Sequence, residues 1–247
     1  MQMRIMAVCN QKGGTGKTSS AWAILCGAKA RGLRALGLDM DIQGNLSFIV
    51  GADSAGLTTG DIMKGKPIKD AIQHTAAGDI VPAGISIAAL PDVDALKRAV
   101  TPLKGAYDLI VIDCPPTLSK PLLAALRAAT EAIIPTTADA LGIQGLYQLR
   151  TSIDQANPDL TITGAFLTRH NGRSVLARDI MDTVKERCAA LRFPFIDTPI
   201  REAVAVKEAQ LLQQNLFDYA PRAKVTADYS ALLDAINIKQ RKVKNNG

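Results

Sequence analysis

The stretch KGGTGKT, from Lys12 to Thr18, decides the fold of this chain of 247 residues. It directly follows the apolar run Ile5–Val8, which is typical of a buried strand, and a helical pattern begins near Lys17. A glycine-rich loop between a strand and a helix indicates a phosphate-binding P-loop, commonly written G-x-x-x-x-G-K-S/T. Here Gln11 stands at the first glycine position, and Lys12 is a second lysine that the common form lacks.

The residue types in this loop suit a phosphate ligand. Glycines 13, 14 and 16 allow positive φ angles, so that successive backbone N–H groups can converge on phosphate oxygens. Lys17 supplies a positive charge, and the N-terminus of the following helix adds a favourable dipole. Thr18 offers a hydroxyl to Mg²⁺. A glycine-rich turn with two surface lysines is the alternative, and the flanking strand and helix patterns disfavour it.

The apolar run Leu109–Ile112 ends in Asp113. A continuous apolar run of this kind predicts a buried parallel strand, whose carboxyl end lies at the edge where open α/β sheets bind ligands. We therefore expect Asp113 to hold Mg²⁺ through water.

Strands and helices are predicted to alternate along the chain. Apolar runs predict strands at Arg4–Cys9, Ala35–Asp39, Asp79–Pro82, Ile85–Ala88, Leu109–Asp113, Ala132–Thr136 and Thr161–Leu167. Apolar spacing of three to four residues predicts helices at Lys17–Arg31, Leu118–Ala129, Leu141–Ala156, Arg178–Leu191 and Ala223–Ile238, the first of them capped by Gly32. This alternation indicates an α/β fold, a doubly wound and mostly parallel sheet with helices on both faces.

Three later segments carry a resemblance to a known family. Leu38–Asn45 is similar to the D-x-D-P-Q-G-N segment of the ParA/MinD deviant-Walker ATPases, with Ile42 in place of the usual proline. Tyr107–Pro116 resembles their Walker B strand, which ends in D-x-P-P, and Ala138–Leu146 falls where they carry a helix-opening A-L-x-G-L run. The resemblance runs from residue 4 to about residue 238, and it implies a P-loop NTPase fold with ATP and Mg²⁺ as cofactors.

The resemblance also implies roles for single residues. Lys12 would reach across a homodimer to the partner's nucleotide and couple hydrolysis to dimerisation, as arginine fingers do. Asp41 would orient or activate the attacking water, and either Asp39 or Asp41 would face the metal. Alternatively, either aspartate caps the short helix after Asn45. The base pocket would come from the segments 168–171 and 198–201. The expected ligand-binding residues are Gly13, Gly14, Thr15, Gly16, Lys17, Thr18, Ser19, Thr168, Arg169 and Pro199.

Positive charge is concentrated in the last third of the chain. Residues 1–164 hold 15 basic and 14 acidic side chains, whereas residues 165–247 hold 14 and 9. A basic surface suits a polyanion, although a solvated face with a disordered tail would give the same composition. The resemblance favours non-specific DNA binding through this region. Ala205 stands where many chromosomal members carry a DNA-contacting arginine, so the candidates for DNA binding are Arg201, Lys207, Arg222 and Lys224.

Composition limits the remaining possibilities. With 47% hydrophobic residues, the chain can bury the core of one domain, 1–247, which ends in a basic tail at 239–247 that we expect to be disordered. The four cysteines are scattered, which disfavours a metal or disulfide framework and suits a reducing cytosol. No apolar stretch approaches the roughly 18 residues of a membrane span, and no separate DNA-binding domain is expected before the first strand. We expect a soluble, cytoplasmic, nucleoid-associated protein.

These observations predict a ParA-type ATPase that dimerises on ATP, binds DNA and segregates plasmid or mobile-element DNA with a ParB-like partner. Three alternatives stay open. A MinD-like membrane ATPase would need an amphipathic C-terminal helix, but Val243 is the only apolar side chain between Lys239 and Gly247. A relative that positions a protein cargo would look the same in sequence. A biosynthetic ATP-dependent ligase of the same superfamily would turn over a small carboxylate without any effect of DNA.

Overall fold

The computed structural model describes residues 3–170 and 175–241. Within these residues, seven strands form a single sheet in the order β3-β4-β2-β5-β1-β6-β7. All pairs are parallel except that of β3 with β4. The strands are β1 (Arg4–Val8), β2 (Ala35–Asp39), β3 (Gln73–His74), β4 (Asp79–Val81), β5 (Leu109–Asp113), β6 (Glu131–Thr136) and β7 (Thr161–Leu167). The predicted doubly wound α/β fold is confirmed.

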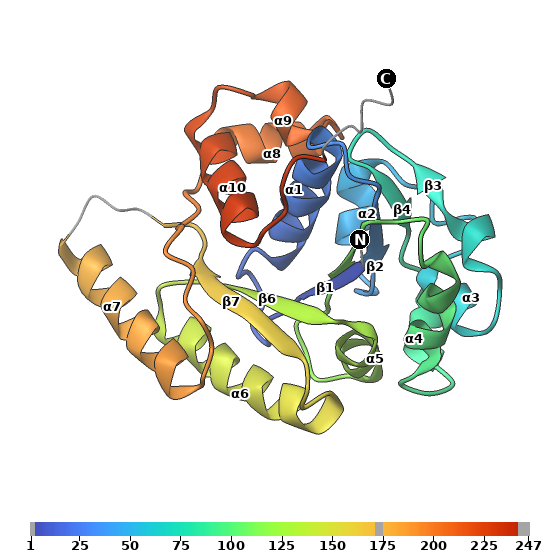
Figure 1. The fold of residues 1–247 in the computed structure, drawn as a ribbon, viewed down its shortest axis with the longest axis horizontal. Helices are drawn as coiled ribbons and strands as arrows, with labels where there is room; N and C mark the ends of the chain where they lie inside the picture. Colours follow the sequence, from blue (N-terminus) through green and yellow to red (C-terminus); the bar gives the residue numbers. More distant parts are fainter. Residues whose placement is uncertain (1–2, 171–174, 242–247) are drawn as a thin grey trace, which may run out of the picture.

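The central strands are buried along their whole length, because helices cover both faces of the sheet. Every residue of β2, β5 and β6 is buried, which explains their continuous apolar runs. Figure 1 shows α1, α8, α9 and α10 together on one face and α5, α6 and α7 on the other. The helices are α1 (Lys17–Ala30), α2 (Asn45–Val50), α3 (Thr59–Met63), α4 (Ala95–Val100), α5 (Lys120–Ala128), α6 (Ala140–Ala156), α7 (Val175–Ala190), α8 (Val204–Leu211), α9 (Leu216–Tyr219) and α10 (Lys224–Ala235).

Helix α1 lies between the sheet and the C-terminal helices. Its residues from Ser20 to Ala28 are all buried, so the helix is surrounded by protein rather than amphipathic. A Cβ atom at Gly27 would overlap the side chain of Leu233 in α10, so the small residue allows the two helices to approach closely. Gly32, with φ +76°, ends the helix as predicted. Because α1 is packed into the core, the P-loop that precedes it is held in place at its carboxyl end.

One predicted strand is a helix in the structure, and several short elements were not predicted. Residues 85–88, predicted as a strand, lie in the 3₁₀ helix η2 (Ile85–Ala89), because Ile85 is 85% exposed and only Ile87 is buried, so the segment offers no apolar face to a sheet. The short helix expected after Asn45 is α2, whereas the two-residue strand β3 and the short helices α3, α4, α8 and α9 were not predicted. The other two 3₁₀ helices are η1 (Ile68–Ala71) and η3 (Thr101–Leu103). The five predicted helices are present, with ends that differ from the predicted ones by at most three residues.

The chain leaves α10 at the amino-terminal edge of the sheet, opposite the P-loop. The backbone N–H of Arg241 donates to the carbonyl of Arg31 (2.9 Å), and the Arg241 side chain lies 3.6 Å from Asp108, which precedes β5. The start of the predicted tail is therefore bonded to the domain, while residues 242–247 lie outside the described residues. Among the helices that are described, none is long and apolar enough to cross a membrane.

Candidate nucleotide site

The P-loop joins the end of β1 to the start of α1. Gly14 (φ +77°) and Gly16 (φ +78°) adopt left-handed backbone conformations, whereas the predicted positive φ at Gly13 is not observed. A Cβ atom at Gly13 or Gly14 would meet nothing within 4 Å, so the space above the loop is open. The N-cap of α1 is Gly16, which has no side chain to bond the helix, so the first N–H groups of α1 are available to an anion.

Lys17 lies over this loop. Its side chain is 7% exposed, and its Nζ donates to the carbonyl oxygen of Lys12 (2.8 Å). Burial lowers the pKa of Lys17, and the nearby carboxylates of Asp113 and Asp41 oppose that shift. The ammonium group is thus held at the mouth of the P-loop, where an anionic ligand would offset the cost of its burial.

Asp113 ends β5 directly beneath the loop and is fully buried. Within the described part of the chain, neither of its carboxylate oxygens has a hydrogen bond of normal geometry. Burial raises the pKa of Asp113 well above its ordinary value, Asp39 adds to the rise, and the nearby Thr18 hydroxyl and Lys17 oppose it. A buried carboxylate without hydrogen bonds is rare in proteins, and the water molecules around a hydrated Mg²⁺ would donate the missing hydrogen bonds to it. The side chains of Thr18 and Asp113 therefore fit the predicted metal.

The contacts of Asp39 and Asp41 distinguish their roles. Asp39 is fully buried, and its Oδ2 accepts from the backbone N–H (2.8 Å) and the hydroxyl (2.7 Å) of Ser47, in the first turn of α2. Its Oδ1 accepts from the N–H of Asp41 (3.2 Å). Burial raises the pKa of Asp39 to about 6, although these hydrogen bonds oppose the rise. The Oδ1 of Asp41 accepts a hydrogen bond from the N–H of Gln43 (3.1 Å), and Asp41 lines the open cavity. Asp39 thus acts as a cap for α2, and Asp41 faces the ligand space.

A cavity of about 610 Å³ lies above the P-loop, within the usual size range of ligand sites. It brings together most of the predicted ligand-binding residues. Thr15, which is buried, and Pro199 do not line it, but Ile200 does. The predicted residues that line the cavity are Gly13, Gly14, Gly16, Lys17, Thr18, Ser19, Asp41, Thr168 and Arg169. Asn171, at the end of one predicted base-pocket segment, lies outside the described residues.

Helix α8 forms the far wall of the cavity, which the sequence did not reveal. Gln210 donates from its Nε2 to the hydroxyl of Ser19 (3.1 Å), a contact between residues 191 positions apart. Ile200 lies in the predicted segment 198–201, and the wall residues that were not predicted are Gln43, Asn45, Pro116, Glu202, Ala203, Val206, Gln210 and Tyr229. Gln43, Asn45 and Pro116 lie in the segments that carry the family resemblance, and Glu202 and Ala203 directly follow the segment 198–201.

Two of the four predicted DNA-binding residues also line this cavity. Arg201 makes a two-pronged ion pair with Asp228 (2.6 and 2.7 Å), and Lys207 pairs with Glu202 (3.0 Å). Arg222 and Lys224 are exposed, and neither forms an ion pair with any residue that the structure describes. The structure therefore separates the candidates into two at the nucleotide cavity and two on the open surface.

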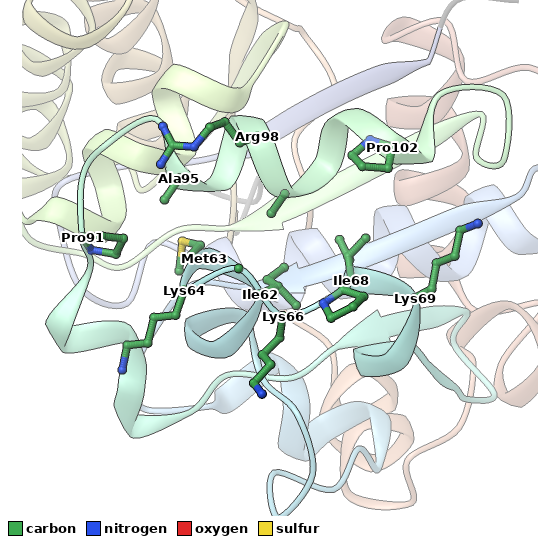
Figure 2. A pocket seen from close by; sticks show the side chains of 13 residues that line it. Ile62, Met63, Lys64, Lys66, Ile68, Lys69, Pro91, Ala95, Arg98 and Pro102 are labelled. Carbon is green, nitrogen blue, oxygen red and sulfur yellow. The ribbon is translucent and has the colours of Figure 1, made fainter.

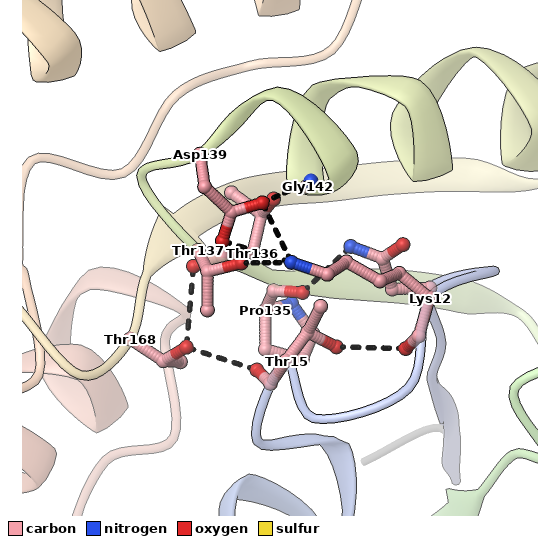
Figure 3. Close-up of polar contacts among 9 residues, drawn as sticks. Lys12, Thr15, Pro135, Thr136, Thr137, Asp139, Gly142 and Thr168 are labelled. Atoms are coloured by element: carbon pink, nitrogen blue, oxygen red, sulfur yellow. Dashed lines mark hydrogen bonds and ion pairs between the residues drawn. The ribbon is translucent and has the colours of Figure 1, made fainter.

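Thr168, at the end of β7, anchors the P-loop from the side. Its Oγ1 donates to the carbonyl of Thr15 (2.9 Å) and lies 3.2 Å from the carbonyl of Thr136, as Figure 3 shows. A Cβ atom at Gly16 would lie 3.5 Å from the Thr168 side chain. The loop is thus tied to the carboxyl edge of a strand far away in the sequence.

Lys12 points to Asp139 of its own chain (Figure 3). Its Nζ lies 2.6 and 2.8 Å from the two carboxylate oxygens of Asp139 and 3.1 Å from the hydroxyl of Thr137. Asp139 caps α6, because its Oδ1 accepts from the N–H of Gly142 (2.8 Å). Partial burial would raise the pKa of Asp139, but the hydrogen bonds from Lys12, Thr137 and Gly142 lower it to about 2. In the single chain, the second lysine is therefore held by an internal ion pair.

Comparison with known proteins agrees with this geometry. A family model described as an AAA domain matches residues 3–163. The chain is 32% identical over 200 residues to the chromosome partitioning protein ParA of Myxococcus xanthus, covering 74% of this chain and 70% of the relative. It is also similar to the solved structure of cobyrinic acid a,c-diamide synthase from Mycobacterium smegmatis with bound ADP and magnesium (TM-score 0.75, 31% identity, 85% of this chain and 92% of the other). A third similar structure is the septum site-determining protein MinD of Pyrococcus horikoshii with Mg-ADP (TM-score 0.78, 26% identity, 95% and 96%).

The chain belongs to the ParA/MinD family of P-loop ATPases. The family assignment made from the three sequence segments is thereby confirmed.

Proposed function

We propose that this chain is a ParA-type ATPase that uses ATP and Mg²⁺ to switch between a monomer and a dimer that binds DNA. The observation that carries the proposal is the arrangement at one cavity: Lys17 held over an open P-loop, Asp41 at the cavity wall, and the unpaired carboxylate of Asp113 beneath. These are the charges that phosphoryl transfer requires. The relatives with bound ADP and magnesium support the same ligands here.

The roles of the site residues follow from their positions. The P-loop N–H groups and Lys17 would bind the phosphates, and the Thr18 hydroxyl and Asp113 would hold Mg²⁺, the latter through water. When bound, the metal would neutralise charge that develops on the phosphate oxygens. Asp41, which lines the cavity, would orient the attacking water. Asp39 would act indirectly, because its hydrogen bonds to Ser47 fix the loop that carries Asp41.

Lys12 would complete the site of a second copy. In the single chain it is bound to Asp139, so it contributes no charge to its own cavity. If the Lys12 side chain left Asp139 and turned to the partner's nucleotide, its charge would lie at the transferring phosphoryl group. Hydrolysis would then depend on dimerisation.

DNA binding would use the basic side chains on the open surface. Arg222 and Lys224 flank the start of α10 and have no carboxylate partner within ion-pair distance in the described residues. Arg201 and Lys207 are weaker candidates, because both are paired and line the nucleotide cavity. The dimer would bind DNA without sequence preference and drive segregation of plasmid or mobile-element DNA, with a ParB-like activator, in the cytoplasm at the nucleoid. The similarity to a chromosome partitioning protein supports this use.

The proposal is tested by fluorescence polarisation of two labelled DNA duplexes of unrelated sequence. Wild-type protein should bind both equally with ATP and neither with ADP, and Lys17→Ala should bind neither. Absence of DNA binding with ATP at low salt, together with sedimentation with anionic liposomes, would instead support a membrane-associated relative of MinD.

A biosynthetic ligase is the second candidate, because cobyrinic acid a,c-diamide synthase is as close in identity as the partition protein. ATP turnover that requires a small carboxylate substrate and is unaffected by DNA would favour it over the partition ATPase.

A further inference from the structure

A second cavity, of about 690 Å³, lies away from the nucleotide site, and the two cavities share no lining residue. It is a groove between the segment formed by α3 and η1 and the segment formed by α4 and η3 (Figure 2). Its lining includes Ile62, Met63, Ile68 and Ala95, which are 2 to 4% exposed. Its rim includes three exposed prolines, Pro67, Pro91 and Pro102. The groove therefore has an apolar floor and a rim with few rotatable bonds.

The rim is strongly basic. Lys64, Lys66, Lys69 and Arg98 line the groove, and no acidic residue does. Arg98 is paired with Asp92 (2.6 Å). The three lysines are exposed, and their ammonium groups form no hydrogen bond or ion pair with the residues that the structure describes. Three positive charges around an apolar floor are thus available to an external ligand.

The carboxylate of Asp61, in α3, offsets only part of this charge. Its Oδ2 accepts from the N–H of Thr58 (2.9 Å) and from the Thr58 hydroxyl, so this carboxylate forms the capping box of α3. Its pKa is lowered mainly by the Thr58 hydroxyl, with smaller contributions from the charges of Lys64 and Lys66. The lysines that line the groove outnumber this one carboxylate, so the rim keeps a net positive charge.

The spacing of the charges indicates the kind of ligand. In Figure 2, Lys64 and Lys66 extend from the loop between α3 and η1, whereas Lys69 extends from the other end of the groove. A small anion would contact one end only, whereas a protein segment with several carboxylates would contact both. The cavity volume is sufficient for a few apolar side chains, and the flexible Met63 can adapt to their shape.

We propose that this groove docks a short acidic segment of a partner protein, with an apolar side chain on the floor and carboxylates on Lys64, Lys66 and Lys69. Helix α3 also contacts the end of β2, because the Thr59 hydroxyl at the start of that helix donates to the carbonyl of Asp39 (2.8 Å). The docking site does not depend on the proposed function, since neither DNA nor nucleotide is needed to form it.

The test is a selection of peptides from a random phage-displayed library on the full chain. Selected peptides should be rich in Asp and Glu, carry an apolar residue, and bind Lys64→Glu/Lys66→Glu roughly tenfold more weakly than wild type. The matched control is Arg222→Glu/Lys224→Glu, a pair of equal charge at the start of α10, which should bind the peptides normally. Both pairs are exposed, so the melting temperatures should stay close to that of wild type.

Methionine methyl NMR locates the bound peptide. A selected peptide should shift the Met63 methyl resonance and leave that of Met6, which is buried in β1, unchanged. Several outcomes would overturn the proposal: no binder that depends on Lys64 and Lys66, selected peptides without acidic residues, or a peptide that leaves Met63 unshifted. Phosphatidylglycerol vesicles that bind through the same lysines, with no peptide binding, would assign the groove to a membrane surface and likewise overturn it.

Discussion

Replacing Asp139 by asparagine should make the chain dimerise more tightly in the presence of ATP. In the single chain, Asp139 holds Lys12 through contacts of 2.6 and 2.8 Å, and this ion pair must break before Lys12 can reach a partner's nucleotide. Asparagine removes the charge but keeps an oxygen that can accept from the N–H of Gly142, so the cap of α6 is preserved.

The size of the effect follows from the exposure of the pair. The side chains are 21% and 46% exposed, so solvent screening limits the ion pair to about 1 kcal/mol, the upper end for surface pairs. A dimer breaks two such pairs. The gain of about 2 kcal/mol corresponds to a dimer dissociation constant that is roughly 30-fold lower, since 1.4 kcal/mol is a factor of about ten.

Sedimentation velocity with ATP, in an Asp41→Ala background that should not hydrolyse it, measures this constant. Asp139→Ala is the comparison, because it also releases Lys12 but removes the cap of α6 and should lower stability by about 1 kcal/mol. An unchanged or weaker dimer in Asp139→Asn would refute the view that the internal pair opposes dimerisation.

The same ion pair gives a prediction about pH. The pKa of about 2 for Asp139 lies below the value of about 3.9 for an unfolded aspartate, so its stabilising contribution is complete above about pH 4 and is lost as the pH falls toward 2. Dimerisation driven by release of Lys12 should therefore not vary between mildly acidic and mildly basic pH. A dimer constant that changes tenfold across that range would show that another group controls it.

Two further substitutions test the DNA surface and the P-loop. In a plot of the logarithm of the DNA-binding constant against the logarithm of the salt concentration, replacing Arg222 and Lys224 by alanine should reduce the slope by roughly two, because each phosphate contact contributes about 0.9. Replacing the exposed Lys97 and Lys104 should leave the slope unchanged. Equal slopes for both pairs would exclude the surface at the start of α10. Thr168→Val removes the hydroxyl that bonds the P-loop. In an equilibrium titration, we expect a fluorescent ATP analogue to bind this variant about fivefold more weakly than wild type. Unchanged affinity would argue against an anchoring role for Thr168.

The parts of the site that the sequence predicts are those carried by contiguous residues. The P-loop lies between one strand and one helix, so its glycines and Lys17 identify it without tertiary information. Asp113 was predicted from its position at the end of an apolar run, because burial of a parallel strand on both faces leaves a clear pattern.

The parts that the sequence did not predict depend on contacts between distant residues. Lys12 and Asp139 are 127 positions apart, and their pairing depends on how α6 packs beside the P-loop. Helix α8 and the segment before it line the cavity, which places Arg201 and Lys207 at its wall, although the sequence analysis gave both as DNA-binding candidates and placed only Arg201 in a base-pocket segment as well. Ile85 was misassigned because an apolar residue in a short run looks the same whether it faces a sheet or solvent.

The nucleotide site itself is tested most directly by titrating a fluorescent ATP analogue, with Mg²⁺, into wild-type protein and Lys17→Ala. Because Lys17 lies over the open P-loop and is the buried positive charge nearest Asp113, its removal should abolish binding while the melting temperature stays near that of wild type. We expect saturable binding in the wild type and none in the variant. Equal affinity in the two proteins would contradict the assignment of this loop as the phosphate site.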